Sequence, residues 1–195
     1  MAELITSRTV QVEGQSVLEL GAGAGLPSIT AALSGADKIV ITDYPAPAIL
    51  KALQKNVDAN LSMNIRERVS VVALDWTAGD EGIDRVTSLV PGKFTRIILA
   101  DTVWMSSLHV AQLHVLTSLL SRERNSRLAI QEELQIAKAV EVDRSPEGVQ
   151  GRQWDKTYLS AAFQAEDDGT EMDRRRWLLV AELRWNMRDV AADWT

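Results

Sequence analysis

The chain contains no cysteine, which excludes a disulfide framework, a cysteine-ligated zinc site and a thiol nucleophile. It also lacks a long apolar run: residues 97–100 are among the longest, whereas a membrane-spanning helix needs about 20 apolar residues. Basic residues are outnumbered, 21 against 27 acidic ones, and a net charge of −6 argues against binding to nucleic acid. No basic stretch followed by an apolar run opens the chain, so we expect no export signal and a cytoplasmic location.

What is present fits an ordinary globular protein of 195 residues, with 46% hydrophobic and 25% charged residues, and we predict one domain over residues 1–195. Apolar, β-branched segments alternate with segments of helical periodicity. We predict strands at residues 17–20, 38–42, 69–74, 96–100, 126–130 and 177–183, and helices at 27–35, 46–60 and 109–120. This alternation predicts an α/β fold with a mostly parallel, doubly wound sheet and helices on both faces.

Two of the predicted helices have an apolar face that we expect to be buried. For residues 46–60 that face holds Ile49, Leu50, Leu53 and Val57, and for residues 109–120 it holds Val110, Leu113, Leu116 and Leu120. Residues 79–92 are predicted to form a loop or a short helix. The stretch 131–174 is polar and weakly periodic, and it carries no clear prediction.

A glycine-rich loop follows the first predicted strand, running from Glu19 to Pro27. Small residues let the backbone turn sharply and approach a ligand, and the next helix offers free N–H groups at its N-terminus. The spacing is G-x-G-x-G, and Leu26 stands where a dinucleotide-binding loop needs its third glycine. No Gly-Lys-Ser/Thr follows, so a phosphate-binding P-loop is excluded too. The loop therefore serves another nucleoside ligand or a tight turn alone.

Acidic residues follow the next three predicted strands. Asp43 ends the second strand, where a carboxylate can bind both hydroxyls of a ribose or simply cap a turn. Asp75 and Trp76 follow the third strand. There the carboxylate can accept a hydrogen bond from an adenine amino group and the Trp76 ring can pack on a flat base, or the ring simply covers the edge of the sheet. Asp101 and Trp104 follow the fourth, where they suit an amine or form an N-cap and a core residue. Together these signals favour a nucleoside site.

These residues carry a resemblance to a known family. The segment 17–28 (VLELGAGAGLPS) resembles motif I of the seven-stranded, Rossmann-like S-adenosylmethionine-dependent methyltransferases. The strings VITDYP (40–45), KNV (55–57), LDW (74–76), ILAD (98–101) and RRRWLLVA (174–181) resemble the protein-lysine methyltransferases in particular. The resemblance is to their fungal nicotinamide N-methyltransferase-like members, which include enzymes that methylate the N-terminus and lysines of elongation factor 1-alpha. It covers residues 14–120 and 154–184.

The resemblance implies a cofactor, S-adenosylmethionine, and a role for each motif. The amino-acid part of the cofactor is expected at motif I, on Glu19, Gly21, Ala22 and Gly23. By the same resemblance, Asp43 is expected to bind its ribose, Tyr44 to lie near the adenine, and Asp75 and Trp76 to contact the adenine. Asp101 and Trp104 are expected to border the methyl donor and the target amine as the catalytic pair.

The implied reaction is a direct displacement at the sulfonium methyl, in which the protein aligns a neutral amine and Asp101 orients it or accepts its proton. No metal is expected. His109 and His114 are five apart and miss the i, i+4 spacing of a zinc-binding helix, so we interpret both as ordinary helix residues.

Two departures from the family fall on its substrate side. Only about 16 residues precede the first strand, without the family's Trp-Asn-Ala-like motif, and the segment after Ile130 lacks the expected Gly/His/Thr-rich turn. We therefore expect a sheet trimmed at the N-terminus and after the fifth strand.

The favoured hypothesis is an N-methyltransferase acting on a protein amine, such as a lysine or the N-terminus of elongation factor 1-alpha. A nicotinamide-like small-molecule methyltransferase and a non-catalytic, cofactor-binding remnant stay open as alternatives. No nucleic-acid or membrane partner is expected.

Overall fold

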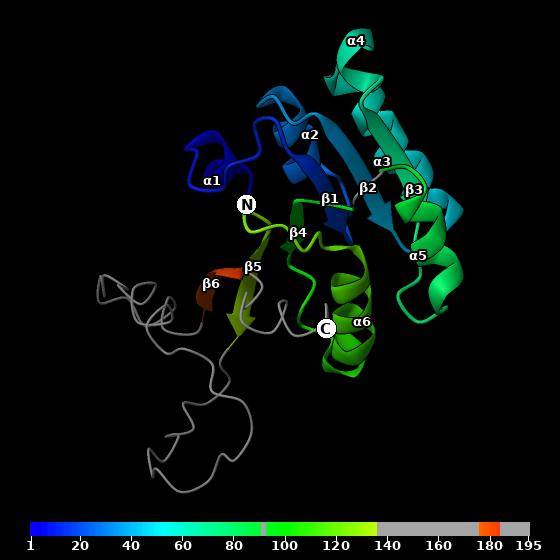
Figure 1. Cartoon of the computed structure of the whole chain (residues 1–195), viewed down its shortest axis with the longest axis vertical. Helices are drawn as coiled ribbons and strands as arrows, with labels where there is room; N and C mark the ends of the chain where they lie inside the picture. The colour runs from blue at the N-terminus through cyan, green and yellow to red at the C-terminus, as the bar shows by residue number, and fades with distance from the viewer. Residues whose placement is uncertain (91–92, 136–175, 184–195) are drawn as a thin grey trace, which may run out of the picture.

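A computed structural model describes residues 1–90, 93–135 and 176–183 of the chain. These residues form one six-stranded sheet in the order β3-β2-β1-β4-β5-β6 (Figure 1). The strands are β1 (Ser16–Leu20), β2 (Lys38–Asp43), β3 (Val69–Ala73), β4 (Arg96–Ala100), β5 (Arg127–Gln135) and β6 (Arg176–Leu183). The first five are parallel, and β6 pairs antiparallel with β5. The predicted doubly wound, mostly parallel α/β sheet is therefore confirmed.

Helices lie on both faces of the sheet, one before β1 and the others between consecutive parallel strands. They are α1 (Ala2–Thr6), α2 (Leu26–Leu33), α3 (Pro47–Asn60), α4 (Met63–Arg66), α5 (Asp80–Thr87) and α6 (His109–Leu119), and a 3-10 turn, η1 (Ser106–Leu108), precedes α6. None of the described helices is long and apolar enough to cross a membrane.

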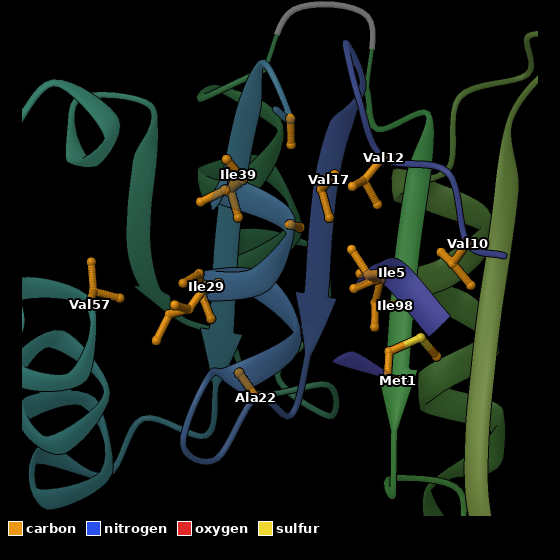
Figure 2. Packing of buried hydrophobic residues seen from close by; sticks show 14 of the residues in the cluster. Met1, Ile5, Val10, Val12, Val17, Ala22, Ile29, Ile39, Val57 and Ile98 are labelled. Atoms are coloured by element: carbon orange, nitrogen blue, oxygen red, sulfur yellow. The ribbon is translucent and has the colours of Figure 1, made fainter. Parts of the chain in front are cut away.

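The core divides into two clusters, one on each face. On one face, Ile5 of α1 and Ile29 of α2 pack against Ile39 of β2 and Ile98 of β4 (Figure 2). The other cluster packs α5 and α6 against the opposite face of the sheet. It includes Ile83 and Val86 of α5, Val115 and Leu119 of α6, and Leu18, Leu20, Ile97 and Leu99 of the strands. Because the central strands are buried on both faces, they are continuous apolar runs rather than alternating ones, which is why the sequence shows them clearly.

The chain reverses direction across the sheet at β1. It winds from β1 to β2 and β3 on one side, then returns to β4 on the other side of β1. In such sheets ligands bind at the carboxyl ends of the strands, in the crevice beside this switch point. The glycine loop leaves β1 at that edge, so the topology brings it beside the segments that follow β2, β3 and β4.

The strand predictions are confirmed, and β5 continues five residues beyond Ile130 to pair with β6. The described residues hold six strands, and any seventh would lie outside the part of the chain that the structure describes. The segment 79–92 contains the short helix α5. The assignment of residues 1–195 to one domain stays a prediction.

The predicted buried face of α6 is partly wrong. Val110 and Leu113 are 83% and 61% exposed, and the residues of the helix that are buried are Gln112, Val115 and Leu119. Apolar residues occur nearly all round this helix, so periodicity does not define a face, and packing against the sheet and the loop after β4 sets its rotation. Similarly, Ile49 of α3 is 37% exposed, whereas Leu53 and Val57 are buried as predicted.

Candidate functional site

The glycine loop after β1 adopts a conformation that only glycine takes easily. Gly21, Gly23 and Gly25 all have positive φ, at 67°, 53° and 76°. At Gly21 a side chain is also excluded by space, since an added Cβ would lie 2.8 Å from Cγ2 of Thr102 and 3.3 Å from the ring of Trp76. The loop after β1 therefore packs directly against the segments that follow β3 and β4.

Hydrogen bonds from two neighbouring elements fix this loop. The N–H of Gly23 donates to Oδ2 of Asp43 at 2.6 Å, and the N–H of Tyr44 donates to Oδ1 of the same carboxylate at 2.7 Å. From α3, Nδ2 of Asn56 donates to the carbonyl of Ala24 at 3.0 Å. Asp43 thus ties the end of β2 to the glycine loop, while each of its oxygens keeps a second lone pair for a ligand.

A cavity of about 860 Å³ opens at the carboxyl ends of the central strands. This size lies within the range of about 300–1,000 Å³ that small-molecule sites occupy. Its wall is mostly apolar and includes three carboxylates but no lysine or arginine. The lining residues are Gly21, Gly23, Ala24, Asp43, Tyr44, Ile49, Ala52, Asn56, Leu74, Asp75, Trp76, Thr77, Asp101, Thr102, Trp104, Met105 and Leu108. The cavity therefore suits a ligand with a flat apolar part, hydroxyl donors and a positive charge.

Eight of the ten residues predicted for the site line this cavity, and Glu19 and Ala22 do not. Ala22 is buried in the core cluster on the α2 side. Glu19 is 1% exposed, and its Oε2 accepts a hydrogen bond from the N–H of Ser28, in the first turn of α2, at 3.0 Å. Burial raises the pKa of the Glu19 carboxyl to about 7, although the hydrogen bonds from Ser28 oppose that rise. Glu19 therefore caps α2 beneath the loop.

Asp75 and Trp76 enter the cavity from the end of β3. Oδ1 of Asp75 accepts hydrogen bonds from both the N–H of Thr77, at 2.8 Å, and its hydroxyl, at 2.7 Å. These two hydrogen bonds lower the pKa of Asp75, so this carboxyl is ionised at neutral pH. The ring of Trp76 packs on Gly21 and against the core cluster on the α6 side. Trp76 thus forms a wall of the cavity.

Asp101 and Trp104 belong to the segment after β4. Asp101 has a φ of 57°, a left-handed conformation that is uncommon for residues other than glycine, asparagine and aspartate. Its N–H donates to the carbonyl of Gln131 in β5 at 2.7 Å, and its side chain is exposed at the cavity. Trp104 is 66% exposed and stands on the same wall.

Several lining residues were missed by the sequence analysis. Ile49, Ala52 and Asn56 recur at helical spacing along α3 and present one stripe of that helix to the cavity. The sequence predicted that Ile49 lies in the core, and gave Asn56 no role. Met105 and Leu108, beside Trp104, had no motif to mark them.

The two histidines make separate contacts. Nε2 of His109 lies 2.6 Å from the carbonyl of Val103, and Nε2 of His114 lies 2.9 Å from Oδ1 of Asp80 in α5. Within the described residues, no group of three His, Asp or Glu side chains is arranged to hold a metal ion.

Comparisons with a protein family and with individual proteins both identify lysine methyltransferases as similar to this chain. The model of a protein family described as lysine methyltransferase matches residues 1–141. A Gibberella zeae protein named protein N-terminal and lysine N-methyltransferase EFM7 is 36% identical over 135 residues, covering 65% of this chain and 51% of the relative. A protein of the same name from Cryptococcus neoformans is 37% identical over 111 residues, covering 56% of this chain and 36% of the relative. The chain thus spans about half, or less, of the length of these relatives.

Solved structures show the same fold at low sequence identity. The [4+2]-cyclase SpnF matches with a TM-score of 0.53 and 16% identity, over 70% of this chain and 45% of that one. YjhP from Escherichia coli matches with a TM-score of 0.51 and 14% identity, over 69% of this chain and 49% of that one. At this level of identity the likeness describes the sheet and its helices and does not extend to chemistry.

Proposed function

Because the chain belongs to the lysine methyltransferase family, we propose that it is an S-adenosylmethionine-dependent N-methyltransferase acting on a protein amine. One observation carries the proposal. Asp43 at the end of β2, Asp75 after β3 and Asp101 after β4 all line one cavity, together with residues of the glycine loop. The names of the relatives support the same activity, since they specify methylation at protein N-termini and lysines.

The cavity fits the proposed cofactor. Gly23 lines the cavity, and a Cβ added there would meet no protein atom within 4 Å, so its bare backbone leaves open space for a ligand. The free lone pairs of Asp43 suit the two hydroxyls of a ribose. The ring of Trp76, with the apolar side chain of Leu74, suits one face of an adenine. When bound, S-adenosylmethionine supplies an electrophilic methyl group carried on a positively charged sulfur.

The protein's own task is to present a neutral amine in line with that methyl group. A lysine ammonium has no lone pair for attack, so it must lose a proton first. Asp101, at the cavity wall, is the group we assign to accept an N–H hydrogen bond from the amine and to take its proton, directly or through one water. The apolar side chains of Trp104, Met105 and Leu108 line the same side of the cavity, and contact of the amine with them would favour its neutral form.

We further propose that the amine belongs to elongation factor 1-alpha, at a lysine or at its N-terminus. The motifs that resemble the fungal members of the family support this substrate, and the names of the relatives support a lysine or an N-terminus as the methylated site. A translation factor as substrate would put the activity in the cytoplasm.

Calorimetric titration of the 195-residue chain with S-adenosylmethionine and S-adenosylhomocysteine tests the cofactor. Binding is expected, and Asp43→Ala should weaken it by roughly 1–3 kcal/mol, the cost of leaving buried polar groups without their partner. Asp37→Ala is the matched control, because Asp37 is exposed beside the opposite end of β2. A folded chain that gives no binding heat would refute the proposal.

The acceptor is tested by transfer of a radiolabelled methyl group to purified elongation factor 1-alpha and to nicotinamide in parallel. Label on the protein alone supports the proposal. Label on nicotinamide alone would identify a small-molecule methyltransferase. Cofactor binding with no transfer to either acceptor would overturn the enzyme proposal and leave a cofactor-binding remnant.

A further inference from the structure

The buried side of α6 carries a polar residue where the fold alone would take an apolar one. Gln112 is 3% exposed, one turn before Val115, which packs against the sheet. Its Nε2 donates a hydrogen bond of 2.7 Å to the carbonyl of Thr102. A buried amide is tolerated only when it is hydrogen-bonded, so this contact explains why glutamine can occupy the position.

A second side chain of α6 contacts the next carbonyl of the same segment. His109 lies three residues before Gln112, on the same side of the helix. Its Nε2 is 2.6 Å from the carbonyl of Val103, and since a carbonyl only accepts, this nitrogen carries the proton. Two successive carbonyls, those of Thr102 and Val103, are thus held by one helix.

These contacts lie next to a residue in a left-handed backbone conformation. Asp101 has a φ of 57°, which aspartate adopts more readily than most residues but still uncommonly, and the contacts around it hold it there. On one side, the Asp101 N–H donates to Gln131. On the other, Thr102 is 5% exposed, and its methyl group would be only 2.8 Å from a Cβ added at Gly21. The turn at Asp101 is fixed from both sides.

We propose that Gln112 is a positioning residue that fixes the segment from Asp101 to Trp104 and so orients the Asp101 carboxylate and the Trp104 ring at the cavity. Gln112 does not line the cavity itself. The inference rests on the proposed function, because it gives the orientation of Asp101 a purpose in methyl transfer. His109 supports the same segment from an exposed position, where water competes for the hydrogen bond.

The test compares Gln112→Leu with Gln54→Leu. Gln54 lies on the exposed side of α3, outside the cavity, and donates to Asp58 one turn away, so the second variant makes the same chemical change without touching the site. Amide hydrogen exchange is measured by mass spectrometry on peptides covering residues 101–108 and, as a reference, β1 and β2. Gln112→Leu should speed exchange in 101–108 at least tenfold while β1 and β2 stay as in the wild type. Gln54→Leu should change neither.

Steady-state methyl transfer gives a second readout. We expect Gln112→Leu to lower kcat roughly 10- to 100-fold, because a misplacement of about 1 Å at the reacting groups has that order of effect. The dissociation constant for S-adenosylhomocysteine should change less than threefold, since the hydrogen bonds that fix the glycine loop come from Asp43 and Asn56 and not from residues 101–104. A role limited to packing would instead speed exchange throughout the sheet and weaken cofactor binding together with kcat, and that pattern would overturn the inference.

A second variant, whose hydrogen bond to the Thr102 carbonyl depends on pH, distinguishes loss of this contact from simple misfolding. In Gln112→Glu a protonated carboxyl can donate to the Thr102 carbonyl, whereas an ionised one cannot and is repelled by it. Burial raises the pKa of a carboxyl, so the protonated form gains population as pH falls. The ratio of variant to wild-type kcat should therefore rise as pH falls from about 8 to 6. A ratio that is flat with pH would contradict the inference.

The outcomes separate the inference from the function on which it rests. If the wild type neither binds cofactor nor transfers methyl groups, the proposed function fails, and exchange in residues 101–108 still decides whether Gln112 holds the segment. If the wild type is active and Gln112→Leu leaves exchange or kcat unchanged, the inference alone fails.

Discussion

Replacing Glu19 by glutamine should remove a pH dependence of the stability of this protein. Glu19 is a buried carboxyl, and its Oε2 accepts a hydrogen bond from the N–H of Ser28. Burial raises its pKa from the ordinary value of 4.5 to about 7. Between these two pH values the folded protein holds a proton at Glu19 that the unfolded chain has released. The free energy of unfolding therefore falls as pH rises through this window.

The structure gives the size of the effect. The difference between 4.5 and about 7, at about 1.4 kcal/mol for each pH unit, corresponds to roughly 3 kcal/mol. Glutamine has nearly the same shape, and its Oε1 can accept the hydrogen bond from Ser28 at every pH. Glu19→Gln should therefore match the wild type near pH 4.5 and exceed it by roughly 3 kcal/mol at pH 8.

Urea denaturation followed by circular dichroism at about pH 5, 6, 7 and 8 measures this difference. Other titrating groups are common to both proteins and cancel when the two free energies of unfolding are subtracted. The slope of free energy against urea should be equal in both, which shows that the comparison concerns stability alone. Parallel pH curves for the two proteins would refute the argument, because the Glu19 carboxyl would then be ionised in the folded state.

Three further outcomes follow from the geometry. Gly21→Ala should lower the free energy of unfolding by about 2–4 kcal/mol, because the added Cβ clashes and the backbone is left-handed. Gly23→Ala should lower it by only about 1–2 kcal/mol, because no atom lies within 4 Å of the added Cβ. Thermal unfolding of the two variants measures the difference. Asp101→Asn should fold like the wild type, because asparagine tolerates a positive φ. It should lose most methyl transfer in the radiolabel assay, because the amide cannot accept a proton from the amine. Activity equal to that of the wild type would show that the carboxylate has no catalytic role. Leu113 is exposed and Leu119 is buried, so in urea denaturation Leu113→Lys should change the free energy of unfolding by less than about 0.5 kcal/mol and Leu119→Ala should lower it by about 2–5 kcal/mol. A larger loss in Leu113→Lys than in Leu119→Ala would contradict the observed rotation of α6.

The strands could be predicted because their signal is local. A central parallel strand is buried on both faces, so β1, β2 and β4 are short apolar runs whatever their neighbours are. The carboxylates at the strand ends were equally visible, because topology places all carboxyl ends at one edge. That rule places Asp43, Asp75 and Asp101 at one predicted site, and all three line the cavity.

Two predictions depended on the direction of single side chains: the buried face of α6, which was partly wrong, and the cofactor role of Glu19, which lies outside the cavity. Leu18 and Leu20 face the cluster that contains α6, so Glu19 between them faces α2, and strand alternation could have separated Glu19 from the loop. For α6 no such rule was available, since its apolar residues surround the helix. Its rotation depends on the contact of Gln112 with Thr102, which lies ten residues earlier in the chain.

The four strand ends support one another, so a single substitution at one of them has more than one effect. Gly21 packs on both Thr102 and Trp76, and Gly23 donates to Asp43, so each motif is also a structural support of the next. Loss of cofactor binding in Asp43→Ala has two sources, a missing acceptor for the ribose and a loosened glycine loop. Asp43→Asn separates them, because the amide keeps an oxygen for the Gly23 N–H but has only one such oxygen to share with Tyr44 and the ribose. If Asp43→Asn binds as weakly as Asp43→Ala while the exchange of the Gly23 amide stays slow, the missing ribose acceptor accounts for the loss.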